Sequence, residues 1–195
     1  MATDRKLLTL ALLGAAATLL PGHSPYRQWY AYRAKHLVVV TDEARPGALA
    51  VATAIASAIA ARWPETRAVP SAARTPLEVV KLLGSGQLQV GLIPATDAVQ
   101  ALEGRGSFAG NGKVPLRAVA VVGSDLLVVL DSYPAERAHD LAQALVESRD
   151  RGPLAEKPPL RGPAPIPFHP GALHYYQGRT ALERAGERTG QPRRG

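Results

Sequence analysis

Short apolar runs alternate with longer amphipathic stretches from His36 to about residue 150. The apolar runs are rich in Val, Leu and Ile, which predicts buried strands over 36–41, 88–93, 116–123 and 126–130, with a weaker candidate over 66–70. The stretches between and after them have helical periodicity and predict helices over 45–63, 75–86, 94–104 and 133–148. Strands that alternate with helices predict an α/β fold with a mainly parallel sheet and flanking helices.

One helix has clear start and stop signals. In TPLEVVKLLGSG, Thr75 and Glu78 form a T-x-x-E capping box, and Pro76 suits the first helical position. Gly84 and Gly86 are typical of a helix end. The sequence therefore predicts a helix that begins after Thr75 and ends at Gly84 or Gly86.

The N-terminus has the pattern of a signal or membrane anchor over residues 1–22. Arg5 and Lys6 precede an uncharged run from Leu7 to Leu20, and a Pro-Gly break follows. The run covers about 21 Å as a helix, which is shorter than the roughly 30 Å hydrocarbon core. Its only small-x-small cleavage site, within residues 15–17, would leave apolar residues on the mature protein. We therefore predict an uncleaved N-terminal apolar helix, and the alternative is a cleaved signal.

Other parts of the chain suggest the rest of the domain organisation. Residues 23–35 combine aromatic and basic side chains, as is common at a membrane–water interface, and form an expected collar. The α/β lobe is expected over 36–150, followed by a Pro-rich segment over 151–180 that ends in a docking motif. Residues 181–195 are expected to form a disordered basic tail. This layout predicts export to the periplasm with anchoring in the inner membrane.

The net charge of +7 is confined to the two ends. Residues 1–36 hold five Lys/Arg against one acid, residues 150–195 hold eight against four, and residues 37–149 hold ten against eleven. A nucleic-acid interface needs a basic folded surface, so we expect no nucleic-acid partner and assign the basic flanks to an anionic membrane surface. The chain has no cysteine, which excludes disulfides and thiolate chemistry.

Two histidines and a tyrosine pair stand out in PIPFHPGALHYYQGR, residues 165–179. His169 and His174 are five positions apart, so on a helix they would point in different directions and could not share a metal ion. Tyr175 and Tyr176 follow Pro-Gly-Ala and fit a short amphipathic helix whose rings pack on the body. We expect a docking element with at least one buried ring, and no metal site.

No motif indicates an enzyme or a cofactor. The loop GRGSFAGNG leaves a predicted helix and enters a predicted strand, whereas nucleotide-binding loops join a strand to a following helix. Neither G-x-S-x-G nor H-E-x-x-H occurs. We therefore predict a protein that is not an enzyme and uses no cofactor.

Three segments resemble the solute-binding subunits of the TAXI type of TRAP transporters. LEVVKLLGSGQLQVGLIPATDAVQALEGRGSFAG (77–110) is similar to a family stretch with the pattern L-L-x-S-G, V-x-L-x-x-A-D-A and G-x-G-P-F-A. VPLRAVAVVG (114–123) follows in the same order, and PFHPGALHYYQGR (167–179) resembles the family's closing P-L-H-P-G-A-x-x-Y-Y. The resemblance covers roughly residues 36–180 and implies a fold like one lobe of a periplasmic binding protein.

The chain departs from this family where a ligand would bind. Family members have two lobes around a ligand cleft, whereas the direct passage from 117 to 148 leaves no room for a second lobe. The family's turn after the first strand resembles nothing in TDEARPGAL, and its glycine pair after the second strand is replaced by Ser71-Ala72-Ala73. If a small carboxylate still binds, its ligands would lie at the carboxyl ends of parallel strands: Thr41, Ser71, Arg74 and Thr96.

Two functions follow as expectations. The first is an exported, membrane-tethered relative of these receptors, which binds or once bound a small organic acid and contacts a transporter component. The second is a ligand-free periplasmic interaction module, or adaptor, that contacts a protein partner through the face a second lobe would have covered.

Overall fold

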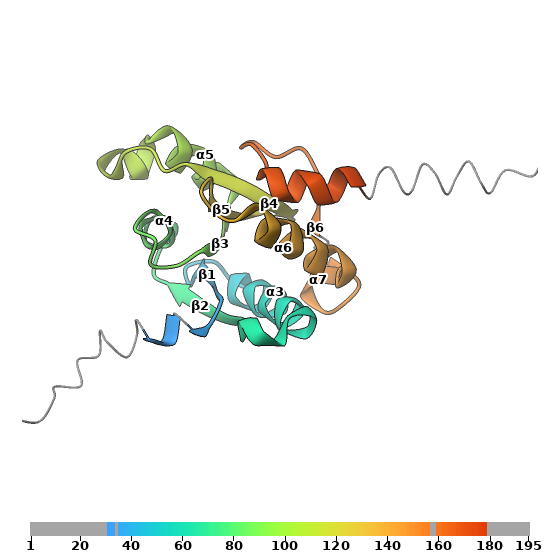
Figure 1. The fold of residues 1–195 in the computed structure, drawn as a ribbon. Coiled ribbons are helices and arrows are strands. Elements are labelled where there is room, and N and C mark those ends of the chain that lie inside the picture. The colour runs from blue at the N-terminus through green and yellow to red at the C-terminus, as the bar shows by residue number, and fades with distance from the viewer. Residues whose placement is uncertain (1–30, 34, 157–158, 179–195) are drawn as a thin grey trace, which may run out of the picture. The chain divides into compact units, whose positions relative to one another are not determined.

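A six-stranded sheet forms the centre of the computed structural model, which describes residues 31–33, 35–156 and 159–178 (Figure 1). Its strands follow the order β2-β1-β3-β5-β4-β6 across the sheet. Their bounds are β1 Val38–Asp42, β2 Val69–Ala73, β3 Val90–Pro94, β4 Leu116–Val122, β5 Asp125–Leu130 and β6 Pro159–Leu160.

The sheet is mixed, although most of its described strands point the same way. β1 pairs in parallel with both β2 and β3, whereas β5 is antiparallel to its neighbours β3 and β4. β4 therefore runs in the direction of β1–β3, and β5 and β6 run against it. The predicted α/β class with a mostly parallel sheet is confirmed. The antiparallel part arises because a two-residue turn at Gly123-Ser124 folds β5 back onto β4.

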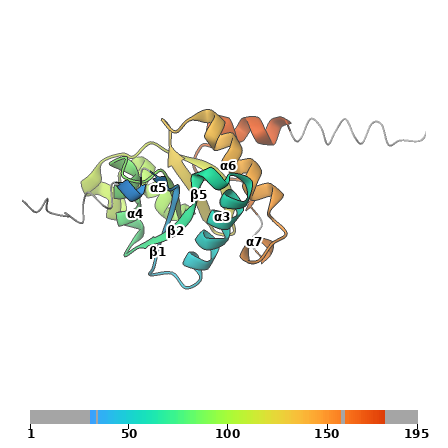
Figure 2. The same ribbon diagram turned by 60° about the horizontal axis from the view of Figure 1, so that its bottom comes forward.

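Helices cover both faces of this sheet (Figures 1 and 2). α3 and α6 lie on one face, and α4 and α5 lie on the other. The helices are α3 Ala48–Arg62, α4 Pro76–Gly84, α5 Ala95–Glu103, α6 Ala135–Glu147 and the short α7 Pro153–Glu156. Two 3₁₀ turns, η1 Pro64–Thr66 and η2 Gly106–Asn111, connect helices to strands, and residues 170–178 form a last helix.

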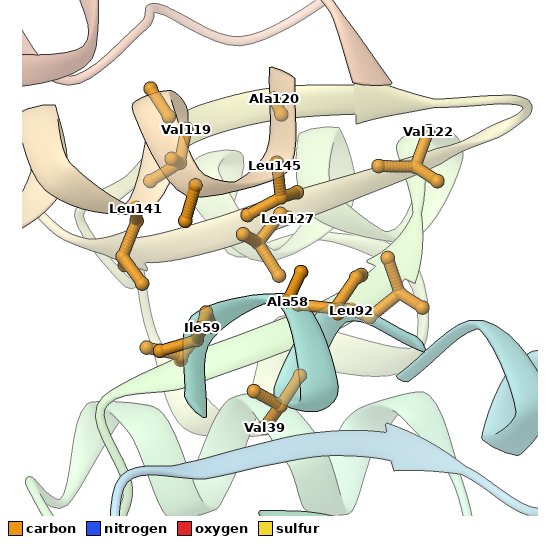
Figure 3. Packing of buried hydrophobic residues seen from close by; sticks show 14 of the residues in the cluster. Val39, Ala58, Ile59, Leu92, Val119, Ala120, Val122, Leu127, Leu141 and Leu145 are labelled. Carbon is orange, nitrogen blue, oxygen red and sulfur yellow. The ribbon is translucent and has the colours of Figure 1, made fainter. Parts of the chain in front are cut away.

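Strand residues alternate between two hydrophobic cores, one on each face. Val39 of β1 packs with Ile59 of α3 on one side, as Figure 3 shows for this core, whereas Val38 and Val40 pack on the α4 side. Because both faces are covered, the strands read as continuous apolar runs. Full burial of each such side chain stabilises the fold by about 1.5–3 kcal/mol.

The helix with the predicted capping box has the predicted start. α4 begins at Pro76, and the Thr75 hydroxyl accepts a hydrogen bond from the Glu78 amide at 3.3 Å. The Glu78 carboxylate reaches one residue further back than in a standard capping box and accepts from the Arg74 amide at 2.9 Å. The helix ends at Gly84, the first of the two glycines predicted to end it.

The second strand lies further along the chain than predicted. β2 begins at Val69, whereas the apolar pattern predicted a strand over 66–70. The chain is still turning through η1 at this point, and Arg67 has a left-handed backbone with φ 44°. The strand can therefore start only after this turn.

The segment around residues 165–178 packs on the body, as the docking motif predicted. Phe168 forms a bridge with Ala118 at the start of β4, with the His169 amide donating to the Ala118 carbonyl at 2.8 Å. Tyr176 is 6% exposed, and its hydroxyl donates to the Val119 carbonyl at 3.2 Å. The expectation that at least one of the two rings is buried is confirmed.

Several predicted segments lie outside the described residues. These are the N-terminal apolar helix over 1–22, most of the collar over 23–35, and the basic tail over 181–195. Within the part of the chain that the structure describes, no helix has the length and apolar character needed to cross a membrane.

Candidate functional site

The carboxyl ends of β1, β2 and β3 meet at one edge of the sheet, which we call the strand-end edge. It comprises residues 41–47, 73–75, 94–97 and 123–125. β5 begins at this edge because Asp125 pairs with Pro94 at the end of β3. Ligands of open α/β sheets bind outside the carboxyl ends of the strands, so this edge is the first place to look for a site.

Two of the four expected ligand-binding residues lie in adjacent strands but on opposite faces. Thr41 is completely buried, and its hydroxyl donates to the Leu92 carbonyl at 3.0 Å. Ser71 pairs with Val40 in the sheet register, so its half-buried side chain lies on the α4 face, whereas Thr41 lies on the α3 face. The fold therefore does not bring these two hydroxyls together.

The other two expected residues are exposed. Arg74 follows β2 directly, and its backbone is held by Glu78 as described above. Thr96 lies in the first turn of α5, facing solvent. Neither side chain has a contact that fixes it toward a common ligand.

A buried ion network occupies the strand-end edge instead. Asp42, the last residue of β1, and Asp125, the first residue of β5, are 0% and 4% exposed. Arg45 donates through Nε to Asp42 Oδ2 at 2.7 Å and through Nη1 to Asp125 Oδ1 at 2.5 Å. Its Nη2 also lies 3.3 Å from the Thr41 hydroxyl oxygen. The guanidinium thus ties β1 to β5 across β3.

The pKa shifts agree with a network in which acids outnumber the base. Burial alone lowers the pKa of Arg45, but the hydrogen bonds to Asp125 and Asp42 outweigh it and raise the pKa above its usual value. Burial raises the pKa of Asp97 above its usual value. The positive charge of Arg45 opposes this rise in pKa, and the negative charge of Asp42 adds to it. Two carboxylates therefore bond the Arg45 guanidinium and a third, that of Asp97, interacts with it electrostatically, so that acids outnumber the base in this network.

Three backbone N–H groups at this edge are bonded within the chain. The N-terminus of α5 could bind an anion, but the Ala95 amide donates to the Ser124 carbonyl at 3.1 Å. At the start of α4, the Glu78 amide bonds to Thr75 and the Arg74 amide bonds to the Glu78 carboxylate. The amides of Ala95, Glu78 and Arg74 are therefore already bonded within the chain, whereas α5 has no side-chain cap.

An open depression of about 460 Å³ lies beside α5. Thr96 is one of its walls, with Gln100 on the same helix and Arg105 in the following loop. Its lining residues are Ala95, Thr96, Val99, Gln100, Arg105, Gly106 and Pro165. Gly106 has φ +58°, a left-handed backbone conformation that favours glycine.

The three residues of the ion network, Asp42, Arg45 and Asp125, were not among the ligand-binding residues expected from the sequence. A signal was present, because TDEAR follows the first strand immediately and an aspartate opens the strand after the Gly-Ser turn. Their meeting could not be predicted from spacing, since Arg45 and Asp125 are 80 positions apart.

The two histidines of the docking motif lie in different surroundings, as their spacing predicted. His169 is buried, with its Nδ1 accepting from the Gly171 amide at 3.2 Å, whereas His174 is exposed. Among the described residues, no group of three or more His, Asp or Glu side chains could hold a metal ion.

Comparison of the sequence with protein-family models and with curated proteins finds no match.

Proposed function

We propose that this chain is a single-lobe relative of TAXI-type solute-binding subunits that acts as an interaction module in the cell envelope. It contacts a protein partner, such as a transporter component, through the strand-end edge. The proposal includes export and anchoring in the inner membrane by residues 1–22, which rest on the sequence pattern of that segment.

The Arg45 network is the observation that carries this proposal. A carboxylate receptor needs an unpaired cation or unpaired N–H groups at its site. Here the guanidinium of Arg45 is already bonded to Asp42 and Asp125, and the Ala95 amide is bonded to Ser124. The other cation of this edge, Arg74, is exposed, and among the described residues no contact fixes its side chain toward a ligand. The acidic excess would also repel an anion. These features favour a protein contact over capture of a small acid.

The connection between β4 and β5 supports the same conclusion. In a two-lobed receptor the chain leaves the first lobe here, builds the second lobe and returns. In this chain the turn at Gly123-Ser124 returns at once, and it lies at the strand-end edge with both residues exposed. The surface that a second lobe would cover is available to another protein.

Site-specific photo-crosslinking in cells tests the proposal with a matched pair of exposed serines at the two ends of β5. A crosslinking residue at Ser124 lies at the strand-end edge, whereas one at Ser132 lies just after β5 at the opposite edge. We expect a discrete crosslinked protein from position 124 and none from position 132. Equal crosslinking from both positions, or none from position 124, would contradict the proposal.

The depression beside α5 favours a second candidate function, binding of a small organic acid. Thr96 supplies a hydroxyl and Arg105 a positive charge at its rim, although Arg105 also pairs with Glu103. A thermal-shift screen of carboxylates on the wild type and on Arg105→Ala separates the two candidates. Stabilisation that the Arg105→Ala variant abolishes would support the receptor, and no stabilisation by any acid would support the interaction module.

A further inference from the structure

Two histidines that are distant in the sequence lie side by side on the surface. His139 belongs to α6 and His174 to the helix over 170–178, and their ring centroids are 5.7 Å apart with a tilt of 44°. His174 is exposed, and one third of the His139 side chain is exposed. Both rings are therefore within reach of an ion from solvent.

The surroundings of His139 prepare it to bind a metal. Its Nδ1 lies 3.3 Å from Asp140 Oδ1, and because a carboxylate only accepts, Nδ1 carries the proton. This bond leaves the Nε2 lone pair for a ligand, as in the carboxylate–histidine pairs that support metal sites. Tyr175 packs edge-on against the same ring at 5.4 Å and restricts its rotation.

We propose that His139 and His174 together bind a divalent transition metal ion, with water in the remaining positions. Two imidazole nitrogens can share an ion only if their rings lie a few ångströms apart, since each nitrogen must approach to about 2.0–2.1 Å. With the ring centroids 5.7 Å apart, rotation of the exposed His174 side chain toward the fixed His139 ring would reach that arrangement. Two nitrogen ligands favour Cu²⁺ over Ni²⁺ and Zn²⁺, and they do not suit Mg²⁺ or Ca²⁺.

The ion would join α6 to the helix over 170–178. A ligand that binds only the folded state raises the melting temperature. Metal binding at this pair is therefore expected to stabilise the attachment of the C-terminal helix to the body. This inference does not depend on the proposed function, because it involves neither the strand-end edge nor the depression beside α5.

Isothermal titration of the full chain, prepared without a polyhistidine tag, tests the site with CuCl₂, NiCl₂ and ZnCl₂. We expect one equivalent of Cu²⁺ to bind, and at least tenfold weaker binding in both His139→Asn and His174→Asn. Gln177→Asn, an exposed change on the same helix, is the matched control and should bind as the wild type does. Asp140→Asn should weaken binding by about tenfold, because it removes the support of His139.

Two further readouts keep the test decisive. His174 is exposed, so its variant should keep the wild-type melting temperature without metal and lose only the rise that Cu²⁺ produces. The electron paramagnetic resonance spectrum of the Cu²⁺ complex should show two imidazole nitrogens. Binding that survives in both histidine variants, or that depends on only one of the two rings, means an adventitious ion only and would overturn the proposal.

Discussion

Arg45 is held by two carboxylates that come from different strands and are almost shut off from water. Buried charges are tolerated when they are paired and hydrogen-bonded. Asp42 is the extreme case, since it is 0% exposed and its Oδ1 has no hydrogen-bond partner. Its charge therefore depends on Arg45, whose side chain is itself 27% exposed.

Replacing Arg45 with methionine should destabilise the fold, because Asp42 and Asp125 would lose their common partner. Breaking a buried pair costs about 3–5 kcal/mol, and we expect the lower end, about 3 kcal/mol, because Arg45 is partly exposed. Urea denaturation measures the loss in the free energy of unfolding. The matched control is Arg62→Met, which removes an exposed ion pair to Glu147 and should cost less than about 1 kcal/mol. Equal losses in the two variants would contradict this account of the network.

Two buried tyrosines should resist ionisation. Burial raises the pKa of Tyr133 to about 12 and raises that of Tyr176 well above its usual value. A tyrosine in the unfolded chain ionises near pH 10, so the stabilising contribution is complete below about pH 10 and is lost as the pH rises toward 12. Absorbance at 295 nm should show at least two of the six tyrosines ionising only as the protein unfolds. Tyr133→Phe and Tyr176→Phe should each remove one late step, and an unchanged titration would show that the ring is not buried in solution.

At the scale of elements, the helix over 170–178 depends on close approach to α6. Gly171 lies in its first turn, and a Cβ there would be 1.9 Å from the Ala135 carbonyl oxygen at the start of α6. This contact accounts for the glycine in HPGA, because any larger residue would separate the two helices.

Gly171→Ala should therefore lower the free energy of unfolding by about 1–3 kcal/mol, as overpacking does. It should also expose the C-terminal helix to proteolysis. Gly178→Ala is the matched control, since nothing lies within 4 Å of a Cβ there. We expect that change to be neutral or slightly stabilising, because it reduces the entropy of the unfolded chain. A Gly171→Ala variant as stable as Gly178→Ala would show that the two helices can move apart freely.

At the scale of the whole molecule, one lobe offers a ligand an open face instead of an enclosed cleft. Polar groups on such a face stay solvated, and each contributes about 1 kcal/mol or less. The cost of immobilising the ligand opposes that gain. Because the Arg45 side chain and the Ala95 amide are bonded within the chain, they are not free to bind a ligand.

We therefore expect no small carboxylate to bind the monomer with a dissociation constant tighter than about millimolar. Calorimetry with a panel of organic acids measures this, and sedimentation identifies the oligomeric state under the same conditions. A micromolar acid bound one-to-one by a monomer would contradict the interaction-module proposal and favour the receptor.

The sequence by itself determined the elements whose causes are local. The α/β alternation follows from apolar runs and helical periodicity, which depend on neighbours within a few residues. The start of α4 follows from the Thr75 cap. The burial of at least one ring of the Tyr175-Tyr176 pair follows from its place in a short amphipathic segment, and only the structure shows that this ring is Tyr176. The sequence also carries a signal for the hairpin between β4 and β5, because a Gly-Ser pair between two apolar runs is typical of a hairpin turn. The expectation of a mainly parallel sheet did not include this antiparallel pair.

Only the tertiary structure decided which distant residues meet. The contact of Arg45 with Asp125 depends on β5 lying next to β3, and the contact of His139 with His174 depends on two helices packing side by side. It also placed Thr41 and Ser71 on opposite faces, although both belong to neighbouring strands. Strand register and helix packing set these contacts, because they are fixed by burial of the two hydrophobic cores. Periodicity along the chain does not tell which residues come into contact across the sheet.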